Sequence, residues 1–319
     1  MKKYLFFAAA ALALASCSND GNMPDNANDP VEIRLTSGLQ VQTRATHNLD
    51  TQLKSGEKVY VWVDDAGSGV TSPELYAKNE LTADGRGNLS GGTAMYFPST
   101  GNAVNIYAIH GNLSGYTAFW GTEQTHTVAT DQTSGDNNTG YATSDLVYCK
   151  NGNVARTSQA VNLQFSHLLS KMEVVLVQGD GAPNISKVEI LNTKLQATFT
   201  PDKTNGCQVT AAGEISGDTR NAITIDNSTT ESANTSSNPT LNEAIIVPQT
   251  IAKDTQLFRI TTDNGGTLYY KVPDGGVTFD GSKKYRYTIT AKLTGLTVSC
   301  SISEWTSAGD ATSGDAVMM

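Results

Sequence analysis

Histidine and cysteine are the residues of this chain best suited to bind a metal ion, but their spacing argues against a metal site. No two histidines are close in the sequence, and neither a His-x-Glu pair nor a Cys-x-x-Cys pair is present. We therefore expect no metal centre and no other cofactor. His167 belongs to a predicted strand, where we expect a partly buried, hydrogen-bonded ring rather than a general base. The four histidines are His47, His110, His126 and His167.

No set of residues predicts catalysis. We predict that Asp64 and Asp65 lie in a turn and point in opposite directions, which makes a poor acid–base couple. The chain contains no Gly-x-Ser-x-Gly segment and no phosphate-binding loop. Residues 84–87 and 263–266 lack the spaced oxygen ligands and final glutamate of an EF-hand, so hairpin turns are the favoured interpretation. We expect a protein that is not an enzyme.

The charge of the chain excludes one class of partner. Its 319 residues include 22 basic and 31 acidic ones, which gives a net charge of -9. Nucleic-acid binding needs a basic surface that replaces the counterions of the phosphates. We therefore expect no nucleic-acid partner.

The first residues resemble the signal of a bacterial lipoprotein. Lys2 and Lys3 precede an apolar stretch, which ends in Leu14-Ala15-Ser16-Cys17. The resemblance implies removal of a signal peptide at 1–16 and acylation of Cys17, which would anchor the precursor in the outer membrane. The polar residues at 17–30 then predict a flexible tether.

The remaining cysteines predict no chemistry. Their number is odd and their spacing wide, which is typical neither of a disulfide framework nor of a metal site. We expect small buried apolar residues at Cys149, Cys207 and Cys300.

Short apolar runs separated by Gly, Ser, Thr and Asn predict an all-β protein. The chain has 29 glycines, and no segment shows a helical period of comparable strength. We predict two β-sandwich domains in tandem at 31–164 and 165–319, the second of which ends in a polar tail at 306–319. Predicted strands lie at 59–63, 75–76, 81–82, 94–98, 104–110, 126–129, 145–149, 160–165, 165–177, 188–190, 195–199, 223–225, 244–247 and 257–261.

Two patterns are especially clear. Residues 59–63 are apolar throughout, which predicts a strand covered on both faces. Nine apolar positions alternate with polar ones between 285 and 302, on either side of Thr294-Gly295, which predicts a hairpin with one buried face.

Apolar and polar residues also alternate from 31 to 43, with a break at Ser37-Gly38. This pattern predicts one strand, or two strands joined by a kink. A polar stretch begins directly after Arg44, so that a protease can reach this arginine.

Four segments of the chain, in this order, resemble the fimbrillin family, the pilins of type V fimbriae. They are the signal ending at Cys17, Thr43-Arg44-Ala45 after a strand, Phe165-Ser166-His167, and residues 284–290 followed by Ile302-Ser303-Glu304-Trp305. The resemblance spans nearly the whole chain and implies two transthyretin-like β-sandwiches. It also implies a lipoprotein precursor that an arginine-specific protease cleaves between Arg44 and Ala45, and an extracellular fimbrium that serves adhesion.

Cleavage at that bond would free residues 31–44 to leave the fold. The vacated groove exposes unpaired backbone groups, which an extended segment of a neighbouring fimbrial subunit can pair with, head to tail. The family resemblance implies a donor at the C-terminus, but two Gly-Asp pairs weaken the strand character of this tail. Stalk and tip roles are favoured and both stay open, as does that of an uncleaved anchor. The donor-strand candidates are Ala316, Val317, Met318 and Met319.

Three aromatic residues support a different function. Tyr116, Phe119 and Trp120 lie in one glycine-rich segment. Exposed rings would stack on sugars, whereas buried rings would close the end of a sandwich, which is the favoured interpretation. A surface-anchored lipoprotein that binds glycans is therefore the alternative function.

Overall fold

The computed structural model describes residues 29–39, 53–68, 74–113, 118–133, 139–179, 181, 183–215, 222–226, 240–292, 295–305 and 312–314. No helix in these ranges is long and apolar enough to cross a membrane.

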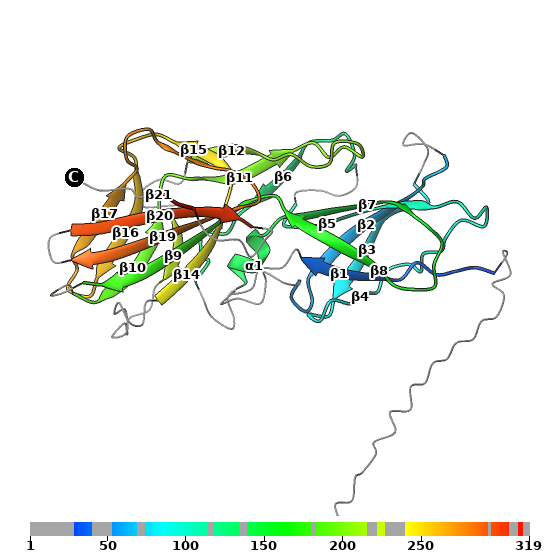
Figure 1. The fold of residues 1–319 in the computed structure, drawn as a ribbon, viewed down its shortest axis with the longest axis horizontal. Helices are drawn as coiled ribbons and strands as arrows, with labels where there is room; N and C mark the ends of the chain where they lie inside the picture. Colours follow the sequence, from blue (N-terminus) through cyan, green and yellow to red (C-terminus); the bar gives the residue numbers. More distant parts are fainter. Residues whose placement is uncertain are drawn as a thin grey trace, which may run out of the picture.

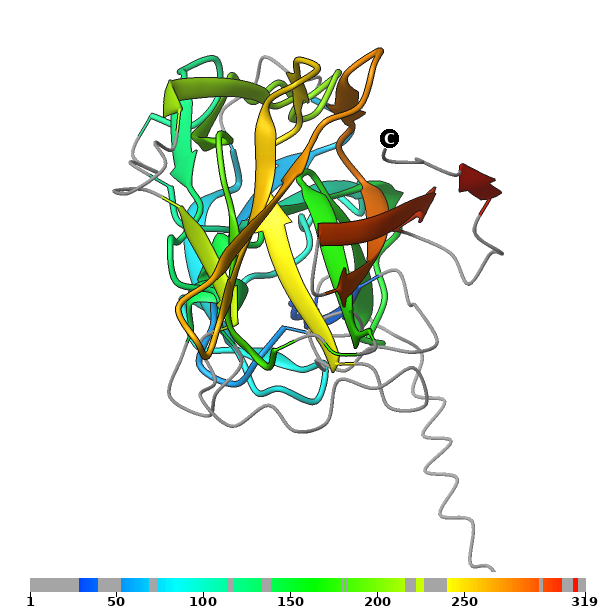
Figure 2. The ribbon, with the colours of Figure 1, turned by 90° about the vertical axis from the view of Figure 1, so that its left-hand side faces the viewer.

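The all-β prediction is confirmed. Within the described ranges the single helix is α1 (Gly140–Ser144), and all other regular elements are strands. They form two β regions that lie end to end along the long axis of the molecule, with α1 between them (Figure 1). Seen from its end, the C-terminal region has strands on all sides of its interior (Figure 2).

The N-terminal region is a seven-stranded sheet with the order β1-β8-β7-β5-β2-β3-β4. Its two strands of highest sequence separation, β1 and β8, are parallel neighbours. The bounds are β1 (Leu35–Leu39), β2 (Lys58–Asp65), β3 (Tyr76–Ala83), β4 (Leu89–Ser90), β5 (Val104–His110), β7 (Val147–Val154) and β8 (Val161–His167).

The C-terminal region contains a five-stranded sheet, β14-β9-β19-β20-β21, and a four-stranded sheet, β13-β10-β16-β17. Smaller sheets are β12-β11-β6 and β15-β18. The bounds are β6 (Gln124–Thr127), β9 (Ser170–Gln178), β10 (Ile185–Ile190), β11 (Lys194–Phe199), β12 (Thr210–Ile215), β13 (Ile223–Asp226), β14 (Thr240–Ile246), β15 (Gln249–Ile251), β16 (Gln256–Thr262), β17 (Thr267–Lys271), β18 (Val277–Phe279), β19 (Lys283–Lys292), β20 (Gly295–Glu304) and β21 (Thr312–Gly314).

Strand β2 contributes side chains to the hydrophobic cores of both regions. Val59, Val61 and Val63 are fully buried and belong to the hydrophobic core of the N-terminal region. Trp62 belongs instead to the larger core that extends through the C-terminal region, as does Tyr107 of β5. Successive side chains of a strand point to opposite faces, so β2 contributes to both cores. The prediction that residues 59–63 are covered on both faces is confirmed.

The predicted C-terminal hairpin is also present. Strands β19 and β20 are paired from Lys283↔Glu304 to Lys292↔Gly295. The inward side chains of β19 are buried, and so is Val298 of β20. The predicted buried face does not extend to Ile302, which is 43% exposed. At Ile302 the hairpin pairs with β21, the edge strand of the sheet.

Two local predictions were wrong for a tertiary reason. Asp64 and Asp65 do not lie in a turn, because β2 continues through both and pairs there with β5. The strand predicted at 165–177 is divided, because the chain passes from the N-terminal sheet (β8) to a C-terminal sheet (β9) at residues 168–169. The predicted domain ranges, 31–164 and 165–319, stay a prediction; β8 runs across residue 164.

Lys203 joins the two regions through an ion-pair cluster. It lies on the connection between β11 and β12, and its Nζ is 2.9 Å from Asp64 Oδ2 and 2.9 Å from Glu74 Oε1. The side chain of Asp64 is 3% exposed and that of Lys203 is 11% exposed. Burial raises the pKa of Asp64, an effect that the hydrogen bond from Lys203 opposes. The ammonium group therefore compensates a carboxylate that water hardly reaches.

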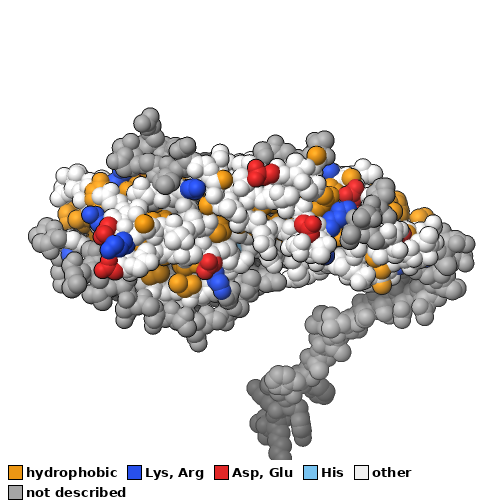
Figure 3. Space-filling view, turned by 90° about the horizontal axis from the view of Figure 1, so that it is seen from above, with side chains coloured by type: hydrophobic (Ala, Val, Ile, Leu, Met, Phe, Trp, Pro, Cys, Tyr) orange, Lys and Arg blue, Asp and Glu red, His pale blue; other side chains and the backbone are white. Residues whose placement is uncertain are grey.

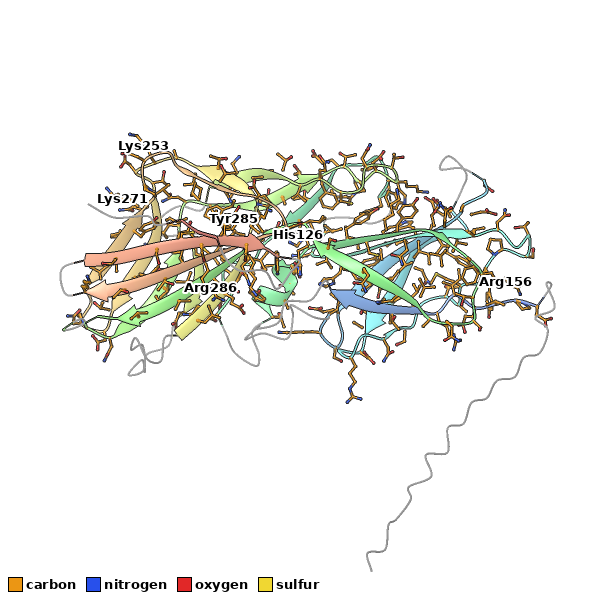
Figure 4. All side chains as sticks on the ribbon, viewed as in Figure 1. His126, Arg156, Lys253, Lys271, Tyr285 and Arg286 are labelled. Atoms are coloured by element: carbon orange, nitrogen blue, oxygen red, sulfur yellow. The ribbon has the colours of Figure 1, made fainter. Side chains whose placement is uncertain are left out.

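We expect Lys203→Ala to lower the free energy of unfolding by about 3 kcal/mol, because removing one partner of a buried ion pair leaves the other charge uncompensated. The matched control is Lys253→Ala, at a residue labelled in Figure 4. It removes an exposed pair with Asp274 and should change stability by less than about 1 kcal/mol. Urea unfolding of both variants measures the difference. Equal effects would contradict a bracing role for Lys203.

Candidate functional site

The segment at residues 31–39 is the described part of the chain that precedes Arg44. Its alternating pattern places Ile33 and Leu35 inward, where they are 4% and 5% exposed, and Glu32 and Arg34 outward. The two inward residues complete the hydrophobic core of the N-terminal region. The sequence therefore predicted the inward positions of Ile33 and Leu35 correctly.

The backbone of this segment is paired on both sides. On one side β1 runs parallel to Val161–Phe165 of β8. On the other side the Ile33 N–H donates to the Met95 carbonyl at 2.8 Å, and the Ser37 N–H donates to the Gly87 carbonyl at 2.7 Å. The segment is thus an inner strand, which closes the space between β8 and the chain that follows β3. Its departure would leave unpaired backbone groups on both neighbours.

Strand β8 in turn depends on β1. Within the described residues β7 pairs with β8 at Val147↔His167 and Tyr148↔Ser166, beyond the part that β1 pairs with. A side-chain hydrogen bond from Asn151 to the Asn162 carbonyl, at 3.0 Å, adds one further contact. The first half of β8 therefore owes its strand pairing to β1.

We call the groove between β8 and residues 87–97, in which the segment lies, its seat. The side chains of the segment do not fill this groove completely. A surface cavity of about 440 Å³ lies beside it, between residues 32–36 and residues 88–95. Apolar side chains, among them Leu81 and Leu89, form part of its wall. An extended chain held by backbone hydrogen bonds, with an apolar side chain at every second position, fits this kind of seat.

The residues at which the sequence predicts chemistry lie outside the described ranges. Lipidation, cleavage and the donor strand therefore stay predictions, as does any role of the first histidine and of the first aromatic residue. The positions concerned are Cys17, Arg44, Ala45, His47, Tyr116, Ala316, Val317, Met318 and Met319.

The C-terminal tail contains a strand that the sequence did not predict. Residues Thr312–Gly314 form β21, which pairs antiparallel with β20 from Ile302↔Thr312 to Cys300↔Gly314. The composition of the tail is polar and contains glycine, so its strand character comes from the sheet edge that it pairs with rather than from its own propensity.

The two regions meet at a buried pair of rings. His167, the last residue of β8, stacks on Trp305 with ring centroids 3.7 Å apart and an angle of 7° between the planes. His167 Nδ1 donates to Asp145 Oδ1 at 3.0 Å. The Ser282 hydroxyl donates to the His167 carbonyl, and the Trp305 N–H donates to the Ser282 carbonyl at 2.8 Å. We call His167, Trp305, Ser282 and Asp145 the clasp.

The sequence predicted a partly buried, hydrogen-bonded His167, and the structure shows a fully buried ring that also stacks on Trp305. The ring is 1% exposed and hydrogen-bonded. Burial opposes ionisation of Asp145, but its interaction with His167 holds the pKa of this carboxyl below its usual value. Among the described residues, no group of three or more His, Cys, Asp or Glu side chains has the geometry to hold a metal ion.

A second buried histidine lies close to the clasp. His126, on β6, donates from Nε2 to the Ser144 carbonyl at 2.8 Å and is labelled at the junction in Figure 4. Burial lowers the pKa of His126 below its ordinary value of 6.5, although the Ser144 carbonyl and the charge of Asp145 oppose the shift. The ring is therefore neutral at neutral pH.

The aromatic segment is packed inside the molecule where it is described. Phe119 is 3% exposed and stacks on Trp62 with ring centroids 4.4 Å apart. Trp120 makes edge contacts with Trp62 and with Tyr107. These contacts agree with rings that close the end of a sandwich.

The surface view shows charged side chains in small mixed groups (Figure 3).

The remaining cysteines agree with the prediction of buried residues in two cases. Cys149 and Cys207 are buried free thiols, and burial raises the pKa of each to about 12. Cys300 is half-buried, and burial raises its pKa to about 11. Thiols with such pKa values are poor nucleophiles at neutral pH.

Sequence reasoning missed the partners of the segment. Met95 and Phe97 were assigned to a strand, but their role in holding Val31 and Ile33 was not recognised. For the contact between Trp305 and His167 the sequence offered no signal, because the two residues lie far apart in the chain.

Comparisons with known proteins agree with this fold. A family model described as fimbrillin-like matches residues 43–305. A solved structure of a candidate cell adhesion protein from Bacteroides ovatus is 17% identical, with a TM-score of 0.62, and the match covers 87% of this chain and 98% of that one. A second, from Bacteroides uniformis, is also 17% identical, with a TM-score of 0.58 and coverage of 86% and 99%. No curated protein matches the sequence.

The buried histidine makes stability depend on pH. Because the pKa of His126 is lower in the folded than in the unfolded state, its contribution is complete above about pH 6.5 and is lost as the pH falls towards the folded pKa. We expect the melting temperature to fall between about pH 7.5 and about pH 5.5, and to fall less in His126→Gln. Thermal unfolding at both pH values measures this difference. His110→Gln is the control; an unchanged pH response in His126→Gln would contradict the assignment.

Proposed function

The chain belongs to the fimbrillin-like family, and on that premise we propose that it is a structural subunit of a cell-surface fimbrium that polymerises by exchange of strands. Its precursor is a lipoprotein anchored through Cys17, and an arginine-specific protease releases it by cleavage between Arg44 and Ala45. Adhesion is the role of the assembled filament.

The pairing of residues 31–39 is the observation that carries this proposal. The segment contributes two buried side chains and backbone hydrogen bonds on both of its sides, yet it lies on the N-terminal side of Arg44. After cleavage, noncovalent contacts alone hold it in its seat. One cut therefore both separates the subunit from its lipid anchor and makes the segment exchangeable.

Once the segment has left, the backbone groups and the apolar surface of its seat determine what can bind there. It offers unpaired backbone donors and acceptors from β8 and from residues 87–97, together with the apolar space that Ile33 and Leu35 had filled. An extended segment of another subunit satisfies both requirements. The surfaces that give and receive the strand differ, so the contact is head-to-tail and extends into a filament.

The C-terminal tail is the candidate donor. Strand β21 shows that part of it can adopt extended structure against a sheet edge. Beyond β21 the sequence continues to Ala316, Val317, Met318 and Met319, which provide the apolar side chains of a donor. The same chain then acts as a stalk subunit; a tip subunit would receive a strand without giving one.

Processing at Arg44 is tested on filaments isolated from the native cell. We expect an N-terminus at Ala45 by mass spectrometry, and we expect Arg44→Ala to leave the acylated Cys17 form in the membrane. Arg86→Ala, which changes an exposed arginine in the turn between β3 and β4, is the matched control and should mature normally. Filaments built of the acylated form would overturn the proposal.

The role of residues 31–39 is tested with purified protein. A chain that begins at Ala45 should lose at least about 3 kcal/mol of stability relative to a chain that begins at Asp29, because two buried aliphatic side chains and their hydrogen bonds are absent. It should also self-associate, as measured by light scattering and denaturant unfolding. A monomer of unchanged stability would refute the exchange mechanism.

A further inference from the structure

The clasp links the removable segment to the C-terminal tail. At one end, β1 provides the strand pairing of Val161–Phe165. Two residues further along β8, His167 stacks face to face on Trp305. Trp305 directly follows β20, the strand that holds β21. A continuous path of neighbouring groups therefore leaves β1 and arrives at β21.

The first step of this path is a loss of support. When β1 leaves, Val161–Phe165 lose all of their ladder pairs with β1, and β7 is the one sheet neighbour that the described residues still give to β8. The remaining attachment of β8 to β7 consists of the two pairs at Ser166 and His167 and the side-chain hydrogen bond from Asn151 to the Asn162 carbonyl. The ring of His167 then stands at the end of a strand that has lost most of its fixed position.

The second step is the response of Trp305. Its ring is 1% exposed, and stacking requires both rings to keep a close and nearly parallel arrangement. The Ser282 hydroxyl donates to the carbonyl of His167, while the Ser282 carbonyl accepts from the N–H of Trp305. A displacement of His167 therefore disturbs both the ring contact and the backbone contact of Trp305.

The third step concerns β21. Its register on β20 begins at Ile302↔Thr312, three residues before Trp305. The pairing comprises three residue pairs, from Ile302 to Cys300, so it adds little stability of its own. Loosening of the end of β20 removes the template on which this short strand forms.

From these three steps we infer that His167 and Trp305 are positioning residues, which keep the C-terminal strand on β20 while β1 is seated and release it when β1 leaves. This inference rests on the proposed function for the event that removes β1 in the cell, which is cleavage after Arg44. The coupling itself is a property of the folded chain and needs neither cleavage nor polymerisation. It ensures that a subunit frees its own C-terminal strand once it has lost its N-terminal strand.

Hydrogen–deuterium exchange on the full chain tests the coupling without proteolysis. Leu35→Asp places a charge in the core and should expel β1, whereas Arg34→Asp, on the outward face of the same segment, is the matched control. In Leu35→Asp we expect exchange at least about tenfold faster in peptides covering 161–167, 300–305 and 312–314. Peptides from β10 and β16 should stay protected, which reports that the C-terminal region is folded.

A second pair of variants tests the clasp directly and serves if Leu35→Asp unfolds the whole chain. Trp305→Ala should speed exchange at 312–314 by at least about tenfold while residues 161–165 stay protected by β1. Trp305→Phe keeps an aromatic ring and should restore protection at 312–314.

The coupling is refuted if exchange at 312–314 stays slow in Trp305→Ala. It is also refuted if exchange at 300–305 and 312–314 stays slow when 161–167 has become fast in Leu35→Asp. Either result leaves the fimbrial role untouched, since that role is tested on filaments; failure of processing at Arg44 would in turn leave the exchange results standing.

Discussion

The fold of the N-terminal region depends on one extended segment that is paired on both sides. Backbone N–H and C=O groups buried without partners are costly, so a sheet that encloses a core must either close or end at a protected edge. Here residues 31–39 close it, between β8 and residues 87–97. The closing strand precedes every other described strand in the sequence, so a single cut after it separates it from the rest of the fold. Its removal leaves backbone groups of β8 and of residues 87–97 without partners, but it does not change the order of the other strands.

The two regions are joined by polar contacts inside an apolar junction. The larger core takes side chains from β2 and β5 of the N-terminal sheet, which fixes the relative position of the regions by packing. Lys203 and the clasp add polar contacts of defined geometry. A buried charge or ring nitrogen is costly unless its ion-pair or hydrogen-bond partner is correctly placed. Such contacts contribute more to a unique arrangement than to total stability.

Membership of the fimbrillin-like family favours a structural role for this chain. The reactive side chains of the described residues are engaged in structure: the thiols of Cys149 and Cys207 are protonated and buried, and the histidines at the junction are hydrogen-bonded. What the proposed mechanism offers to a partner is backbone pairing, a chemistry that any extended chain can supply and that register and apolar pockets make specific. In the proposed mechanism, function resides in a strand and its seat rather than in a cluster of side chains.

The sequence by itself determined the fold class, the C-terminal hairpin and the inward face of residues 31–35, because these follow from the period of side chains along the chain. It did not determine which strands pair. The parallel contact of β1 with β8, the ion pair of Asp64 with Lys203 and the stacking of His167 on Trp305 each join residues more than 100 positions apart. Local patterns state which side of a strand is buried, but the neighbour is selected by the packing of the whole chain. For this reason Asp64 was wrongly placed in a turn, and β21 emerged only where the edge of β20 gave a polar segment a template.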